Sequence, residues 1–317
     1  MSDAGPSPAE LARYALVTPA RGARAGERTA LAAGGSLEFL DARPYQPGDE
    51  PRHVDWRAYA RTRRLTTRTY HAERAADVLV LFDDDAGMAL HGKPAWLAAL
   101  ATVLRPAARD EGRLTFLRAS GPAVDATPGR GGDAAVERFL VALRELEPAS
   151  AGAEGEAARG GTPGAGGRDT ATVDGPFARL ARRLARAPRR GRTEQVLVLS
   201  DGLDAGPVTP LLSAVRARGA HLAMLRTLAP VERAPAPDAV ELVDVEDGRR
   251  TPVDPEDVAR YRARLAALER RQRRAVTRAG HRLDDADVPE GAASAAPGAL
   301  RRAALAALLR ARWLQPR

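Results

Sequence analysis

The sequence contains no cysteine. Disulfide bonds, thiolate zinc sites and cysteine nucleophiles are therefore excluded, and the composition fits a reducing compartment. Aromatic residues make up only 4% of the chain, so a surface of stacked rings for single-stranded nucleic acid is not expected. The sequence also lacks an apolar run of about 18 residues and an apolar signal-peptide segment near its start. We therefore expect a cytoplasmic protein without a transmembrane segment.

Lysine is almost absent as well. Lys93 is the single lysine among 49 basic residues, and the formal net charge is +8. A basic protein of this kind raises nucleic acid as a partner. Alanine, glycine and proline are abundant beside the arginines, however, and this composition is typical of codon bias as much as of phosphate binding. Nucleic-acid binding therefore stays an alternative and is not the main prediction.

Two apolar runs, each followed by carboxylates, are the most informative feature of the sequence. The first run is VLVLF at 78–82, followed by Asp83 to Asp85, and the second is VLVLS at 196–200, followed by Asp201. Short runs rich in Val and Leu are typical of strands buried on both faces of a parallel sheet. Ligands of such sheets bind beyond the carboxyl ends of the strands. If the two strands are neighbours, Asp83, Asp85 and Asp201 converge at one edge.

Strand-like runs alternate with helical stripes along the rest of the chain. This alternation predicts an α/β fold with a mostly parallel sheet and helices on both faces. We expect that domain over residues 77–317, with a flexible insertion at about 148–171 that is rich in Gly, Ala, Pro and Arg. Residues 1–76 form the preceding segment, with a helix at Pro8 to Val17. The run at Val240 to Val245 is predicted to extend the sheet.

The segment RPYQPGDEPRHVDWRAYART at 43–62 has an unusual density of special residues. One interpretation is a structural clamp, in which Val54, Trp56 and Tyr59 anchor the segment to a core while its arginines and Asp55 pair with one another. The other is a docking surface for another protein. The residues that we single out in this motif are Arg43, Pro44, Tyr45, Gly48, Asp49, Arg52, Asp55, Trp56 and Arg61.

This motif, followed by the first buried strand and its aspartates, resembles the signature of a bacterial family called domain of unknown function 58. The core of that family resembles a von Willebrand factor type A domain. The resemblance continues through VLVLSDG at 196–202 and VELVDVEDG at 240–248. It implies a von Willebrand factor A-like fold and a non-enzymatic protein-interaction module. It also implies a partner, an AAA+ ATPase of the MoxR class, in the maturation or remodelling of other proteins.

The resemblance further implies a metal-ion-dependent adhesion site, whose hydroxyl and carboxylate oxygens suit Mg²⁺. Asp83 matches the first ligand and Asp201 the later aspartate, while Thr172 is the best match for the loop threonine. Asp85 and Gly87 stand where the pattern has serines. The expected site is therefore degenerate, with Mg²⁺ or no cofactor at all, and its carboxylates either hold a cation that a partner completes or meet a basic partner directly.

Two enzymatic interpretations compete with this one. The first is a metal-dependent hydrolase that uses the same aspartates to activate water. The second follows from GMALHGK at 87–93, which matches the spacing of a phosphate-binding P-loop. Pro94 stands where a P-loop has the Ser or Thr that binds Mg²⁺, and three aspartates precede the loop, so nucleotide binding is disfavoured.

Overall fold

The computed structural model describes residues 5–17, 38–46, 54–71, 76–109, 111–129, 132–146, 175–188, 194–203, 206–235, 241–243 and 250–317. The chain divides into two compact units. The sheet unit comprises residues 1–19 and 76–317, and the hairpin unit comprises residues 20–75. In the described part of the chain, no helix combines the length and the apolar character that crossing a membrane requires.

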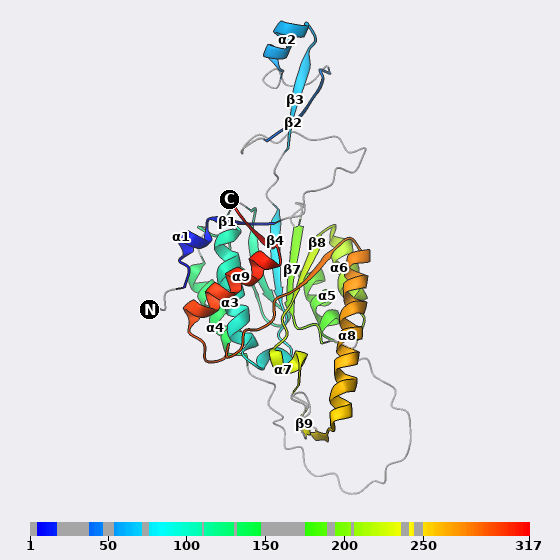
Figure 1. Cartoon of the computed structure of the whole chain (residues 1–317). Helices are drawn as coiled ribbons and strands as arrows, with labels where there is room; N and C mark the ends of the chain where they lie inside the picture. The colour runs from blue at the N-terminus through cyan, green and yellow to red at the C-terminus, as the bar shows by residue number, and fades with distance from the viewer. Residues whose placement is uncertain are drawn as a thin grey trace. The chain divides into compact units, whose positions relative to one another are not determined.

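A six-stranded sheet forms the centre of the sheet unit, with the order β11-β8-β7-β4-β5-β6 (Figure 1). All neighbouring strands are parallel except β5 and β6, which are antiparallel. The sheet is thus largely parallel, as the sequence predicts. Its strands are β4 (Asp77–Phe82), β5 (Leu114–Arg118), β6 (Ala123–Asp125), β7 (Glu194–Ser200), β8 (His221–Arg226) and β11 (Arg282–Asp285).

The two apolar runs are neighbouring strands. β4 and β7 pair in parallel, from Asp77 opposite Glu194 to Phe82 opposite Leu199. Both strands therefore end at the same edge of the sheet, which we call the carboxyl edge. The predicted adjacency of Asp83 and Asp201 follows from this register and is confirmed.

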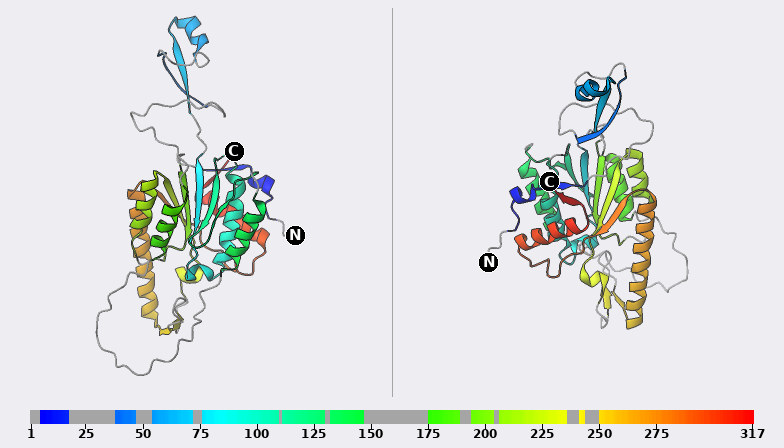
Figure 2. Two further views of the ribbon diagram at one scale, coloured as in Figure 1. Left: turned by 180° about the vertical axis from the view of Figure 1, so that it is seen from behind. Right: turned by 45° about the horizontal axis from the view of Figure 1, so that its top comes forward.

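Helices cover both faces of the sheet (Figures 1 and 2). Side chains alternate between the two faces of a strand, so Val78, Val80 and Phe82 join one core cluster while Leu79 and Leu81 join the other. The first cluster is covered by α3 (Lys93–Ala107), α4 (Asp133–Arg144) and α9 (Pro297–Arg310). The second is covered by α5 (Pro176–Arg186), α6 (Thr209–Arg218) and the end of α8 (Pro255–Arg278).

The described N-terminal residues belong to the sheet unit. A capping box at Ser7 begins a single turn of helix, α1 (Pro8–Leu11), where the sequence predicted a helix as far as Val17. The chain then forms β1 (Tyr14–Leu16), which pairs antiparallel with β12 (Leu314–Pro316). Leu11 and Leu16 are buried against the α3 side of the core. The two ends of the described chain therefore lie side by side.

One predicted strand does not join the sheet. The run at Val240 to Val245 gives β9 (Glu241–Val243), which pairs antiparallel with β10 (Arg250–Pro252) in a separate two-stranded sheet. The outer strand next to β8 is β11 instead. β11 buries only Leu283 fully among four residues, because an outer strand has one neighbour. Its polar sequence therefore gave no strand signal.

The hairpin unit consists of β2 (Glu38–Pro44) and β3 (Thr66–His71), which pair antiparallel, and α2 (Trp56–Thr62). Asp55 caps α2, because its Oδ1 accepts a hydrogen bond from the Ala58 N–H at 2.9 Å. Val54 is buried, but the Trp56 side chain is 58% exposed. That Val54, Trp56 and Tyr59 anchor this segment to a core stays a prediction.

The remaining motif residues of the hairpin unit are partly described. The Arg43 guanidinium donates to Pro44 O at 3.2 Å, and the Tyr45 N–H donates to Leu65 O at 3.0 Å, which joins the two strands at their ends. Arg61 is exposed in the last turn of α2. Gly48, Asp49 and Arg52 lie outside the described residues, as does the predicted insertion at 148–171.

Candidate functional site

Three consecutive carboxylates follow β4, and Asp83 is the one that faces β7. Asp83 is fully buried. Its Oδ2 accepts a hydrogen bond from the Ser200 hydroxyl at 2.6 Å, and the same hydroxyl oxygen accepts one from the Gly202 N–H at 3.0 Å. The Asp83 N–H donates to Leu199 O at 2.9 Å and so continues the β4–β7 ladder. Asp83 is thus held by the end of the neighbouring strand.

Asp84 and Asp85 are held by other neighbours. Asp84 pairs with Arg118 of β5 at 3.1 Å and accepts a hydrogen bond from the Ser120 N–H at 3.0 Å. Asp85 pairs with Arg179 of α5 at 2.5 Å. Successive residues of an extended chain point to opposite sides, so three adjacent carboxylates do not share one centre. The three carboxylates of the run therefore bind partners on three different elements, β7, β5 and α5.

Asp201 meets the chain's single lysine. The Lys93 ammonium donates to Asp201 Oδ2 at 2.8 Å and to Gly87 O at 3.1 Å, and it also pairs with Glu232 Oε1. The Lys93 side chain has no exposed surface, and the carboxylates of Asp201 and Glu232 are 8% and 12% exposed. Glu232 comes from α7 (Pro230–Arg233), 139 residues away along the chain. Neither Lys93 nor Glu232 was predicted as a site residue.

The long helix α8 holds this part of the site in place. The Tyr261 hydroxyl donates to Glu232 O at 2.7 Å, and the Gln272 side-chain N–H donates to Gly202 O at 2.7 Å. Glu269 pairs with Arg233 at 2.9 Å. One face of α8 therefore fixes both α7 and the loop after β7, which are the segments that present Glu232 and Asp201 to Lys93.

The environment of Asp83 disfavours its charged form. Burial and the nearby charges of Asp201 and Asp85 raise the pKa of Asp83, the Ser200 hydrogen bond and Arg179 lower it, and together they bring the pKa to about 7. The burial effect is the largest because water no longer solvates the carboxylate. The protonated form of Asp83 is therefore favoured far more than that of a carboxyl group in water, and the Ser200 hydroxyl donates to its Oδ2.

The predicted metal ligands are only partly brought together. Asp83, Asp85 and Asp201 lie at the carboxyl edge, but Ser200, Arg179 and Lys93 respectively bind them. Thr172 lies outside the described residues. Over the described ranges, no group of three His, Asp or Glu side chains is arranged to hold a metal ion. The arrangement around Lys93 does not fit Mg²⁺ as an additional occupant, because the ammonium already uses the Asp201 oxygen.

The P-loop spacing at 87–93 has a structural explanation. Residues Ala86–Ala89 form the 3-10 turn η2, and Gly92 has a φ of +77° at the start of α3. An ammonium group has three hydrogen-bond donors, and all three of Lys93 are used within the chain. Lys93 therefore has no donor left for a phosphate group, in agreement with the sequence argument from Pro94.

Gly92, which directly precedes Lys93, packs closely against the backbone of Ala293. A Cβ at position 92 would lie 2.6 Å from Ala293 N, and the positive φ adds strain for any other residue. We expect Gly92→Ala to lower the free energy of unfolding by about 1–3 kcal/mol, as measured by urea denaturation. Gly121→Ala is the matched control, because Gly121 has a φ of +96° with no neighbour within 4 Å of the added atom. Equal losses at both positions would refute a steric role for the Ala293 contact.

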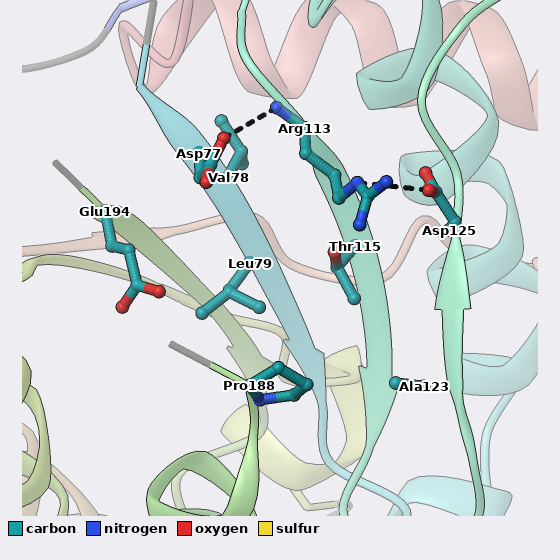
Figure 3. Close-up of a pocket in the computed structure, with 9 residues that line it drawn as sticks. All are labelled: Asp77, Val78, Leu79, Arg113, Thr115, Ala123, Asp125, Pro188 and Glu194. Atoms are coloured by element: carbon teal, nitrogen blue, oxygen red, sulfur yellow. Dashed lines mark hydrogen bonds and ion pairs between the residues drawn. The ribbon is translucent and has the colours of Figure 1, made fainter. Parts of the chain in front are cut away.

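A pocket of about 170 Å³ lies at the opposite edge of the sheet (Figure 3). It is lined by the first residues of β4 and β7, Asp77 and Glu194, and by Arg113 and Asp125. Arg113 pairs with Asp125 at 3.1 Å, and Glu194 pairs with Arg218 at 2.6 Å. These ion pairs hold strands and helices together, and the residues that line this pocket do not include those of the carboxyl edge.

The fold and this edge define an α/β protein whose acidic strand ends are bound by other side chains of the same chain, Asp83 by Ser200 and the other carboxylates by basic groups. The family described as "Protein of unknown function DUF58" matches residues 41–275. The chain belongs to this family. The match includes the motif of the hairpin unit, both apolar strands and most of α8, and so confirms the family resemblance seen in the sequence.

Similar proteins add little beyond the family. Uncharacterized proteins of Mycobacterium bovis and of two Mycobacterium tuberculosis strains are 28% identical over 138 residues, which is 42% of this chain and 44% of those proteins. The chain thus matches less than half the length of these relatives. A crystal structure of the pilus adhesin SpaC from Lactobacillus rhamnosus GG is 10% identical, covers 77% of this chain and 32% of the adhesin, and has a TM-score of 0.33. A score this low supports no inference.

Proposed function

We propose that the chain is a non-enzymatic protein-interaction module with a von Willebrand factor A-like fold. Its partner in this proposal is an AAA+ ATPase of the MoxR class, and the pair acts in the maturation or remodelling of other proteins. The sequence motifs that resemble domain of unknown function 58 support the partner. The largely parallel sheet with helices on both faces is compatible with the fold.

One contrast at the carboxyl edge supports binding over catalysis. The carboxylates of Asp83, Asp201 and Glu232 are almost fully buried and bonded to other groups of the chain. A general base must reach the proton that it removes, and these groups are largely covered and held by other groups of the chain. At the same edge, Leu203 after β7 and Val231 in α7 are 37% and 45% exposed. Large apolar side chains on a rim of this kind suit contact with another protein.

The proposed contact can be tested at Leu203 and Val231. We expect the intact chain to bind a purified MoxR-class ATPase of its own host, and the double variant Leu203→Asp/Val231→Glu to weaken binding by at least about 10-fold. The measurement is isothermal titration calorimetry with the ATPase loaded with a non-hydrolysable nucleotide. A protein contact loses affinity because the variant places two charges in a desolvated interface.

The matched control adds charge at the opposite edge of the sheet. Ala217 is exposed in the last turn of α6, near the amino end of β8. Ala217→Glu is expected to leave binding unchanged. The proposal fails if the intact chain shows no binding at about 100 μM ATPase, a limit weaker than most functional contacts. If the double variant and Ala217→Glu lose affinity by the same factor, the contact does not lie at the carboxyl edge.

The two alternatives make different predictions. A metal-dependent hydrolase requires carboxylates that bind a metal and its water, whereas the carboxylates of the described edge already have partners. A nucleic-acid binder requires free arginine faces, and α8 carries several exposed arginines, although Arg260 pairs with Asp257 and Arg262 donates to Pro235 O. An affinity for double-stranded or single-stranded nucleic acid that falls steeply with salt concentration would favour this alternative.

A further inference from the structure

Lys93 occupies a position where a positive charge needs a specific reason. It is the chain's single lysine, it is fully buried, and it is the first residue of α3. The N-terminus of a helix is itself partly positive and disfavours a cation. Burial also removes the water that solvates an ammonium group. The surrounding oxygens must therefore compensate for both effects.

The compensation comes from three separate segments. Gly87 of η2 supplies a carbonyl at 3.1 Å, Asp201 after β7 supplies a carboxylate at 2.8 Å, and Glu232 of α7 supplies the second carboxylate. These three acceptors match the three donors of an ammonium group. The second oxygen of each carboxylate is also used: Asp201 Oδ1 accepts from the Leu203 N–H at 3.0 Å, and Glu232 Oε2 from the Ala229 N–H at 2.8 Å.

This set of oxygens is the kind that a hard divalent cation takes. Mg²⁺ binds carboxylates, carbonyl groups and water at about 2.0–2.1 Å. Position 87 and position 201 are two of the positions that the adhesion-site resemblance places around the metal. Here both contribute oxygens to Lys93. A divalent ion cannot share these oxygens with the ammonium, because the two cations would repel each other at close range.

We propose that the ammonium group of Lys93 is the built-in cation of the carboxyl edge, which joins η2, the loop after β7 and α7 without a metal ion. The oxygens of this site are bound by a residue of the chain itself, so no ion from solution is needed. If the proposed function is correct, the chain consequently contributes no Mg²⁺ of its own to the contact, and any Mg²⁺ requirement comes from the nucleotide site of the ATPase. That consequence rests on the proposed function. The expectation that the chain alone binds no metal ion at this edge does not rest on it.

The intact protein provides the first test. We expect no saturable Mn²⁺ binding up to about 1 mM, a range that includes weak carboxylate sites, as followed by the electron paramagnetic resonance signal of free Mn²⁺. The Tm is expected to be the same in Mg²⁺ and in EDTA. Stoichiometric Mn²⁺ binding that Asp201→Asn removes would overturn the proposal, whatever the result with the ATPase.

Two variants of Lys93 provide the second test. Lys93→Ser removes the ammonium and leaves space beside Gly87 O, Asp201 and Glu232, so we expect it to gain one Mn²⁺ site per chain and a Tm that rises with Mn²⁺. Lys93→Met fills the same space with an apolar side chain and is expected to gain no site. A folded Lys93→Ser protein that binds no Mn²⁺ would contradict the proposal. If Lys93→Ser folds only with Mn²⁺, the proposal is supported, and if it folds in neither condition, the titration of the intact protein decides.

Discussion

Lys93→Met is expected to lower the free energy of unfolding by about 3–5 kcal/mol, the usual effect of removing one partner of a buried ion pair. The methionine retains most of the apolar stem, so the loss reports the charge and not a cavity. Without the ammonium, the carboxylates of Asp201 and Glu232 remain nearly buried with no cation between them. Urea denaturation followed by circular dichroism gives the free energy directly.

Removing the stranded charges is the matching rescue. In Lys93→Met/Asp201→Asn/Glu232→Gln the three groups are neutral, so the uncompensated buried charge that causes the large loss is removed. We therefore expect the triple variant to recover most of the loss. Arg260→Met, which breaks an exposed pair with Asp257, is expected to cost less than about 1 kcal/mol. A Lys93→Met protein as stable as Arg260→Met would show that the buried pair contributes nothing.

The sequence predicts the centre of the fold because the central strands bury both faces. β4 and β7 are apolar at nearly every position, so their type is evident without knowing their neighbours. The helices are predictable for a related reason. A capping aspartate at Asp254 and the αL residue Gly219 mark where α8 begins and where α6 ends. Each of these signals depends only on residues close together in the sequence, so it can be recognised without the structure.

The periphery of the fold depends on long-range pairing and is therefore hidden. β11 is a strand because its backbone pairs with β8, which lies more than fifty residues earlier. β1 pairs with β12 at the other end of the chain. Conversely, the run at Val240 to Val245 has strand character, but its described residues pair with β10 and not with the central sheet. The residues of a strand do not by themselves determine which other strand it pairs with.

The candidate site shows the same limit. The proximity of Asp83 and Asp201 follows from the order of two strands and was predicted. Lys93 was recognised only as part of a P-loop spacing, although a single lysine among 49 basic residues is itself a signal. Glu232 gave no signal, because it meets Lys93 only through the packing of α7 and α8. The basic residues that bind an acidic run come from distant parts of the chain. The carboxylates can therefore be recognised in the sequence, but their partners cannot.

Asp83→Asn is expected to raise the free energy of unfolding at about pH 8 by up to ~4 kcal/mol, since one pKa unit corresponds to about 1.4 kcal/mol. Burial, reinforced by the charge of Asp201, raises the pKa of Asp83 from 3.8 to about 7. An acid with a raised pKa destabilises the folded state only when it must ionise there. The stability is thus fully present below the unfolded pKa near 4 and is lost as pH rises through about 7. Asparagine never ionises, and its side-chain oxygen still accepts from Ser200.

The pH dependence of this difference is the measurement. The stability curves of the parent and Asp83→Asn should diverge between about pH 4 and pH 8, with the parent falling relative to the variant. Asp257→Asn is a control of opposite sign. Hydrogen bonds from the Asp254 backbone and from Arg260 lower the pKa of Asp257, so its contribution is present above the unfolded pKa and is lost as pH falls. If the Asp83→Asn curve runs parallel to the parent, the carboxyl edge does not hold Asp83 in the buried, partly protonated form on which the site's electrostatics depend.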